Sequence, residues 1–464
     1  MMKDVLLIRP RLEIVDYGSV SPPLSLGYLA AALIKNNISV VIIDQVAHKY
    51  TQKDLLQKIT ELSPKIIGFG AYTPEILSVY DDVNAIKNKF PDIKIILGGP
   101  HPSALPQLTM QENKNIDFIV AGEGEITIVE LAKAIINKQN SYDAINGIYY
   151  RNGNEIIHTS PRELIKNIDE ISFPEYDLLD MNMYTYFQKE FSGLRSMNMF
   201  TSRGCPFLCT YCSHAVFSRL VRYRSIDNIM DEISILYNKY EVRSISFVDD
   251  CFTLKKSRVI EICDQIIKNN FKIKWSCLSN ITTIDEPLLN KMKEAGCYKI
   301  SFGVESGNQQ LLDNVRKNQN LNQSKNIIKL TKKTGIQTLA FFMIGLPGET
   351  KATVKQSKKL AKNINPDFIS ISILCPLPGS DIYAEHNDIL PKNWANYQLT
   401  AFDKLPAATV SNLSVVELQK ELKRFYRNFY LSPQYILSSL RKVKNPKDIF
   451  FYIKKALKVG KYWI

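Results

Sequence analysis

Three cysteines, Cys205, Cys209 and Cys212, lie within the stretch TSRGCPFLCTYCSH, with no fourth cysteine beside them. A structural zinc site takes four ligands that usually come as two pairs, and a disulfide framework needs an even number of cysteines. A cubane [4Fe–4S] cluster has four irons, so three thiolates leave one iron open to a non-protein ligand. The spacing C-x3-C-x2-C therefore predicts an iron–sulfur cluster with a vacant coordination position. A zinc or redox site is the alternative.

The other five of the eight cysteines stand singly among apolar residues. They are Cys251, Cys263, Cys277, Cys297 and Cys375. This distribution predicts buried, reduced thiols in a cytosolic protein.

The cysteine stretch follows the first strand of a repeating pattern. Apolar runs are predicted as strands at 197–202, 244–250, 273–279, 298–305, 338–345 and 368–374. Helical segments are predicted between them at 226–240, 256–270, 285–296, 324–335 and 352–364. Six βα units without an obvious closing pair predict a partial (β/α)6 barrel of the TIM type. In such a barrel the site residues lie at the carboxyl ends of the strands.

The cysteine spacing, with Tyr211 before the last cysteine and a (β/α)6 pattern behind it, resembles the radical SAM enzymes. In that family the open iron binds the amino and carboxylate groups of S-adenosylmethionine. An electron from the cluster then cleaves the sulfonium to methionine and a 5′-deoxyadenosyl radical. The resemblance implies that the three cysteines are metal-binding and catalytic. It also implies S-adenosylmethionine contacts at the ends of the second, fourth and fifth strands, from Asp249, Asp250, Glu305, Ser306 and Gly345.

The first 140 residues show a separate alternation of strands and helices. Strands are predicted at 4–10, 38–44, 65–71, 93–99 and 116–122, with helices at 24–37, 51–63, 74–90 and 125–137. The strands are continuous apolar runs, as in parallel strands covered on both faces. They predict a doubly wound, Rossmann-like α/β sheet of about five strands, with a ligand at the carboxyl ends.

The loops of this sheet resemble the cobalamin-binding domain fused to one large branch of radical SAM enzymes. They include SPPLSLGYL, GAYTPE, GGPHPSALP and AGEGE, and with the barrel the resemblance covers about residues 3–400. It implies cobalamin contacts from Pro23, Leu24, Asp44, Thr73, Gly98, Gly99, His101, Gly122 and Glu123. The Asp-x-His-x-x-Gly loop of many cobalamin domains is missing, so His101 is expected to make a loop contact and His48 to lie on the surface. A nucleotide or flavin site is the alternative, although G-x-G-x-x-G and a Walker lysine are both missing.

The formal charge of +13 is concentrated near the end of the sequence, where residues 411–464 hold twelve Lys and Arg and three acids. Within it, 447–464 is predicted to form a basic amphipathic helix. This helix either packs on the barrel with a solvated lysine face or contacts the inner membrane face. The rest of the chain is nearly neutral, so no nucleic-acid partner is expected. MMKDVLLIRP is read as a buried strand rather than a signal peptide, and a cytoplasmic location is expected.

Four segments are expected. They are a cobalamin-binding domain at 1–142, a linker with a hairpin at 143–195, a radical SAM core at 196–400 and a basic helical region at 401–464. The resemblance implies a methyltransferase that acts on an unactivated carbon of a small or lipid-like substrate, with a flavodoxin or ferredoxin as electron donor. An oxidative cyclase without methyl transfer is the first alternative. A non-catalytic cobalamin or iron–sulfur sensor is the second.

Overall fold

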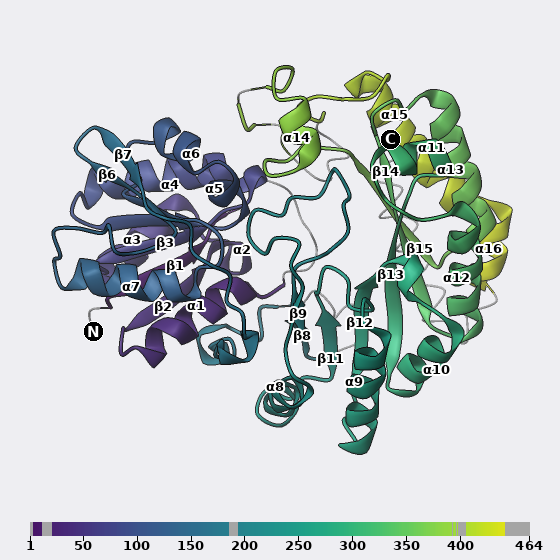
Figure 1. Cartoon of the computed structure of the whole chain (residues 1–464), viewed down its shortest axis with the longest axis horizontal. Helices are drawn as coiled ribbons and strands as arrows, with labels where there is room; N and C mark the ends of the chain where they lie inside the picture. Colours follow the sequence, from purple (N-terminus) through teal and green to yellow (C-terminus); the bar gives the residue numbers. More distant parts are fainter. Residues whose placement is uncertain are drawn as a thin grey trace. The chain divides into compact units, whose positions relative to one another are not determined.

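A computed structural model describes residues 3–11, 21–184, 194–391, 393–395, 397 and 405–440 (Figure 1). The chain divides into two compact units. The first comprises Met1–Pro206, Ser213–Ser246 and Pro378–Ser380. The second comprises Phe207–Cys212, Phe247–Leu377 and Asp381–Ile464. No helix within the described residues combines the length and apolar character needed to cross a bilayer. The predicted basic helix at 447–464 lies outside the described residues.

The first unit contains a seven-stranded sheet in the order β2-β1-β3-β4-β5-β6-β7. Its strands are β1 (Val5–Arg9), β2 (Val40–Asp44), β3 (Ile66–Gly70), β4 (Lys94–Gly98), β5 (Phe118–Val120), β6 (Ile148–Asn152) and β7 (Glu155–His158). The first five pair in parallel, as their continuous apolar sequences predict. The strand order reverses between β1 and β3, and such a switch point is where open α/β sheets bind ligands.

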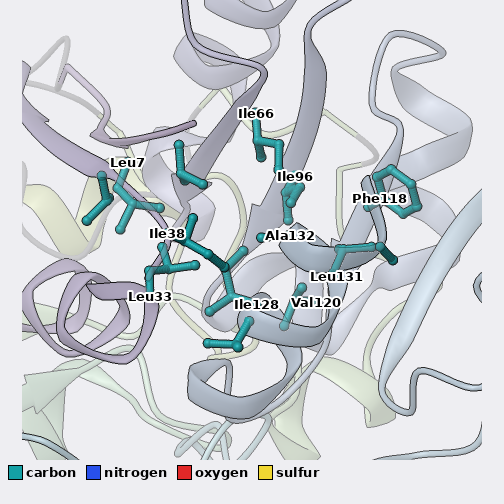
Figure 2. Close-up of a cluster of buried hydrophobic side chains, with 14 of the residues drawn as sticks. Leu7, Leu33, Ile38, Ile66, Ile96, Phe118, Val120, Ile128, Leu131 and Ala132 are labelled. Carbon is teal, nitrogen blue, oxygen red and sulfur yellow. The ribbon is translucent and has the colours of Figure 1, made fainter. Parts of the chain in front are cut away.

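Helices cover both faces of this sheet, as expected for parallel strands with apolar side chains on each face. They are α1 (Leu24–Lys35), α2 (Gln45–His48), α3 (Gln52–Leu62), α4 (Ile76–Lys89), α5 (Pro100–Ala104), α6 (Pro106–Glu112) and α7 (Glu125–Ile136). Figure 2 shows Leu33 and Ile128 converging on strand residues such as Ile66 and Ile96. Each fully buried side chain of this kind contributes about 1.5–3 kcal/mol.

The predicted hairpin at β6 and β7 extends the sheet instead of lying in a linker. Strand β6 pairs antiparallel with β5, so Tyr150 lies opposite Phe118. Ile148 and Tyr150 are buried in the same core as Phe118, which explains the placement. The turn follows Asn152 at Gly153, whose φ of +60° suits glycine.

A second sheet of six strands has the order β15-β14-β13-β12-β11-β8. These strands are β8 (Ser196–Met199), β11 (Ser244–Phe247), β12 (Lys274–Ser279), β13 (Cys297–Glu305), β14 (Gln337–Ile344) and β15 (Phe368–Ile373). The intervening helices are α8 (Ile226–Asn238), α9 (Lys256–Lys268), α10 (Glu286–Glu294), α11 (Gln309–Asn314), α12 (Leu321–Lys333) and α13 (Lys351–Ile364). Strands β12 to β15 pair in parallel. The six predicted strands are all found, and the predicted fold class is confirmed.

The region after β15 is helical, with α14 (Asp381–Glu385), α15 (Val415–Tyr430) and α16 (Pro433–Leu440). Helix α15 begins with a capping box between Ser414 and Glu417. It covers β15 with two tyrosines. The backbone N–H of Ile371 donates to Tyr426 Oη at 2.8 Å, and that of Ile369 donates to Tyr430 Oη at 3.2 Å. Both hydroxyls also donate back to the carbonyls of the same residues, so they bind the backbone of an edge strand.

Candidate functional site

The cysteine stretch begins after a short strand, β9 (Ser202–Arg203). Gly204 follows with φ of +89°, and a Cβ there would lie 2.3 Å from the carbonyl oxygen of Leu220. Only glycine is therefore tolerated before Cys205. None of the three cysteines forms a disulfide: Cys205 is half-buried, Cys209 is buried and Cys212 is exposed.

Residues 207–212 are held within the second unit by backbone hydrogen bonds and by the packing of an aromatic ring. The Thr210 N–H donates to the carbonyl of Val315 at 3.1 Å, and the Thr210 carbonyl accepts from Ile382 N–H at 3.0 Å. The ring of Tyr211 packs against an apolar cluster that contains Leu311, Val315, Leu346, Leu374 and Ile382. These contacts fix Thr210 and Tyr211, the two residues between Cys209 and Cys212 in the sequence.

A buried lysine, Lys317, completes the surroundings of these two cysteines, and sequence reasoning missed it. Its Nζ lies 2.9 Å from Glu305 Oε1 and 6.0 Å from the centre of the Tyr211 ring. Burial alone would lower the pKa of Lys317, but the negative charges of Glu305, Cys209 and Cys212 raise it above its ordinary value. Lys317 is therefore a permanent cation beside the thiols.

The backbone aims Glu305 at this lysine. Strand β13 has a register shift against β14 between Gly303 and Glu305, and bulges of this kind redirect side chains. Glu305 itself adopts φ of +62°, which is uncommon for a residue with a side chain and often marks a functional site. A Cβ on Gly303 would lie 2.3 Å from Glu305 Oε1 and 2.6 Å from Lys317 Nζ. Gly303 therefore makes room for the ion pair.

The two neighbouring thiols differ in acidity. A hydrogen bond from Cys212, assisted by Lys317, lowers the pKa of Cys209 to about 6. The same hydrogen bond raises the pKa of Cys212. A thiolate is the metal-binding form of cysteine, so the donor set fits an iron–sulfur cluster. Among the described residues, no three His, Cys, Asp or Glu side chains converge as a single-ion site.

The other residues predicted to contact S-adenosylmethionine also follow strand ends. Asp249 and Asp250 follow β11 after one intervening residue, Val248, and the pKa of Asp250 is raised by burial and by the charge of Asp249. The buried Ser306 hydroxyl accepts from the Asn308 N–H at 3.2 Å and lies 3.4 Å from Ser357 Oγ. That hydroxyl shapes the turn after β13. A ribose contact from it stays a prediction.

The turn after β14 depends on a buried carboxyl, that of Glu349. Glu349 accepts hydrogen bonds from the N–H groups of Gly345 and Leu346. Burial raises the pKa of Glu349 to about 7. Gly345 has φ of +91°, so glycine is required where this loop turns away from the strand.

Glu349→Gln is expected to raise the melting temperature at pH 8 and to leave it almost unchanged at pH 5. The folded state keeps the proton up to about pH 7, whereas the unfolded chain loses it near 4.5. The stability contributed by the neutral carboxyl of Glu349 is fully present below pH 4.5 and is lost as the pH rises to about 7. The glutamine variant keeps this stability because its side chain stays neutral at every pH. Calorimetry from pH 5 to 8 measures both slopes. The exposed Glu385→Gln should keep the wild-type slope, and equal slopes for all three proteins would refute this assignment.

The carboxyl edge of the first sheet carries the residues predicted to contact cobalamin. Strands β3, β4 and β5 end in pairs of small residues, Gly70-Ala71, Gly98-Gly99 and Ala121-Gly122. A Cβ on Gly122 would meet nothing within 4 Å. This run of small residues leaves a side-chain-poor edge beside the β1/β3 switch point, and such an edge suits a flat macrocycle.

His101 and Thr73, predicted from separate loops, lie together at this edge. His101 Nδ1 is 3.1 Å from Thr73 Oγ1, and the His101 N–H donates to the Ala71 carbonyl. Burial lowers the pKa of His101 to about 4, so the imidazole is neutral at physiological pH. These bonds give His101 a role in joining two loops. Its relation to cobalt stays a prediction.

Asp44 lies at the end of β2 and has several partners. Its carboxylate accepts from the N–H groups of Val46 and Ala47 and pairs with Arg9 at 3.2 Å. Nearby, burial raises the pKa of Glu75 to about 7. Charged groups therefore surround the switch point.

Pro23, Leu24 and Glu123 have structural partners of their own. Pro23 precedes the first turn of α1, and Leu24 packs on the apolar cluster of Tyr28, Ile168 and Ile171. Both carboxylate oxygens of Glu123 bind buried arginines. Cobalamin contacts from these residues stay predictions.

Comparison with known proteins finds two matching protein families and several relatives along the whole chain. Residues 199–361 match the radical SAM superfamily, and residues 11–132 match the B12 binding domain. The chain is 34% identical to "Uncharacterized methyltransferase PH0819" of Pyrococcus horikoshii over 99% of this chain and 98% of that protein. It is 30% identical to the anaerobic magnesium-protoporphyrin IX monomethyl ester cyclase of Rubrivivax gelatinosus over 95% and 79%, respectively. In fold it is similar to OxsB solved with aqua-cobalamin and S-adenosylmethionine, with a TM-score of 0.76, 19% identity, and 98% and 71% coverage.

The chain therefore belongs to the radical SAM superfamily, in the branch that carries a B12-binding domain ahead of the radical SAM core. It is an enzyme whose cofactors are a [4Fe–4S] cluster, S-adenosylmethionine and cobalamin. The predicted family, enzyme class and cofactors are confirmed.

Proposed function

We propose that this enzyme transfers a methyl group to an unactivated carbon of a small or lipid-like substrate. The observation that carries the proposal is the full-length similarity to a protein named as a methyltransferase. The Cys209–Lys317–Glu305 group in one unit and the small-residue edge of the B12-binding domain in the other support it. Together they provide for the two kinds of cofactor that such a transfer needs.

The proposal assigns roles to the chain's own residues. Cys205, Cys209 and Cys212 would hold the cluster, and the hydrogen bond from Cys212, assisted by the charge of Lys317, favours the thiolate form of Cys209. Lys317 and Glu305 present opposite charges that suit the carboxylate and the amino or ribose groups of S-adenosylmethionine. Asp249 and Asp250 add acidic acceptors. When bound, the cluster supplies the electron that cleaves S-adenosylmethionine, and methylcobalamin supplies the methyl group. Gly98, Gly99 and Gly122 keep the cobalamin edge free of side chains.

Oxidative ring closure without methyl transfer is the second candidate. The 30% identity to a magnesium-protoporphyrin cyclase over 95% of this chain favours it. A reduced flavodoxin or ferredoxin would serve as electron donor in either case. A membrane contact by residues 447–464 stays a proposal, which rests on their basic and apolar sequence alone.

The two candidates differ in their co-products. Reconstituted anaerobic protein is expected to convert S-adenosylmethionine to both 5′-deoxyadenosine and S-adenosylhomocysteine in the presence of substrate, because one molecule is cleaved and a second remethylates cobalt. Chromatography after incubation with a reductant and a lipid or porphyrin extract measures both. Formation of 5′-deoxyadenosine alone would favour the cyclase. The absence of both products would contradict both proposals.

A further inference from the structure

A buried charge network joins the loop after β5 to the residues that precede Cys205. Glu123 Oε1 lies 2.7 Å from Arg203 Nη1, and Glu123 Oε2 lies 2.6 Å from Arg222 Nη1. The side chains of all three residues are at most 5% exposed. Glu123 Oε2 also accepts from the Ile165 N–H at 2.9 Å, so every acceptor in this group is used inside the fold.

The two arginines lie opposite each other across a short ladder. Strand β10 (Arg222–Tyr223) pairs antiparallel with β9, and Arg222 is the direct partner of Arg203. Like charges placed opposite each other on a ladder repel and destabilise it. Glu123 offsets this repulsion because each of its oxygens binds one guanidinium. A second acid, Glu125, pairs with Arg203 at 2.5 Å and balances the charge.

The Arg203 guanidinium is also surrounded by aromatic rings. Its central carbon lies 4.7 Å from the ring centre of Phe200, 5.0 Å from that of Phe217 and 5.8 Å from that of Tyr28. These rings exclude water, so the charges interact more strongly than they would at the surface. Arg203 is followed directly by Gly204 and Cys205, so the position of Arg203 constrains the position of Cys205.

The network continues to the predicted cobalamin edge. The N–H of Gly122, the residue before Glu123, donates to Ser103 Oγ at 3.0 Å. Ser103 belongs to α5, the helix that contains His101. A continuous series of contacts therefore runs from the loop after β4, through Gly122 and Glu123, to Arg203 and Cys205.

We infer that Glu123 is a positioning residue for the iron–sulfur cluster, which acts by holding the β9–β10 ladder closed so that Cys205 keeps its place as a ligand. The inference rests on the proposed cluster site. The inference assigns the AGEGE loop of the B12-binding domain a role in positioning a cysteine of the radical SAM core.

The test compares three forms of the reconstituted full-length enzyme: wild type, Glu123→Gln and Asp82→Asn. Asp82 is the control, because its fully buried carboxyl pairs with Arg11 at 2.8 Å in the same unit and belongs to α4 rather than to the β9–β10 ladder. The readouts are the rate of iron release to a chelator, the electron paramagnetic resonance spectrum of the reduced cluster, and hydrogen exchange of residues 199–206. Residues that orient metal ligands typically affect metal retention about 10- to 100-fold.

Glu123→Gln is expected to release iron at least tenfold faster than wild type, to alter the cluster spectrum and to speed exchange of residues 199–206. Asp82→Asn is expected to match wild type in all three readouts, because its ion pair with Arg11 lies outside the network. Equal behaviour of the two variants would overturn the inference. If Glu123→Gln does not fold, Arg222→Lys replaces it, and a wild-type rate of iron release in that variant would overturn the inference equally. A wild-type protein without a cluster would instead refute the proposed function.

Discussion

Cys209→Ala is expected to abolish cleavage of S-adenosylmethionine and to reduce bound iron sharply. Cys209 is the buried member of the three thiols, and Cys212 together with Lys317 holds its pKa at about 6, so it is the thiolate available at neutral pH. A cubane that loses one of only three protein ligands has no replacement among its neighbours, because the other five cysteines are buried elsewhere. Iron and sulfide analysis together with 5′-deoxyadenosine formation measures the effect.

Cys263→Ala provides the matched control. Cys263 is fully buried in α9, and burial raises the pKa of its thiol well above the ordinary value. This variant should keep the iron content and cleavage activity of wild type while losing some stability to the small cavity. Retained iron and cleavage in Cys209→Ala would end the case for a cluster at this loop.

Lys317→Met is expected to cost about 3–5 kcal/mol of folding free energy, because it leaves the buried carboxylate of Glu305 without its partner. It is also expected to weaken S-adenosylmethionine binding about 10- to 100-fold, the worth of one charged hydrogen bond. Denaturant titration measures the first effect. Isothermal titration of the reconstituted enzyme under anaerobic conditions measures the second.

A double variant separates the structural role of Lys317 from its binding role. Lys317→Met with Glu305→Gln removes both charges, so most of the lost stability should return while the binding defect persists. The control is Lys358→Met, which breaks the ion pair with Glu421 between α13 and α15 of the same unit. That variant should lose stability and keep affinity. Normal affinity in the double variant would show that the Glu305–Lys317 pair only supports the fold.

Much of the fold follows from local sequence patterns. The parallel strands of the first sheet are largely runs of buried apolar residues, and caps such as Ser414 mark where helices begin. Short helices were missed where prolines obscure the period, as at Pro100 and Pro106. The hairpin at β6 was assigned to a linker because pairing with β5 depends on tertiary contacts that no local pattern contains.

The site could be predicted only where function imposes a spacing on neighbouring residues. The three cysteines have such a spacing, but Lys317 does not. Its position depends on a turn in which Arg316 and Asn318 both adopt positive φ, which the sequence RKNQN does not indicate. Glu123 and Arg203 are 80 residues apart, and only the folded chain shows that they form a pair.

The two tyrosines of α15, Tyr426 and Tyr430, determine where a truncated form of this enzyme can end. The match to the radical SAM superfamily stops at residue 361, before β15 and well before Tyr426 and Tyr430. An expression fragment cut at that boundary would lack β15 and the hydroxyls that bind its peptide groups, and the newly bared backbone of β14 would invite aggregation. A working catalytic fragment therefore has to extend through α15, because sequence-family limits and folding limits differ here.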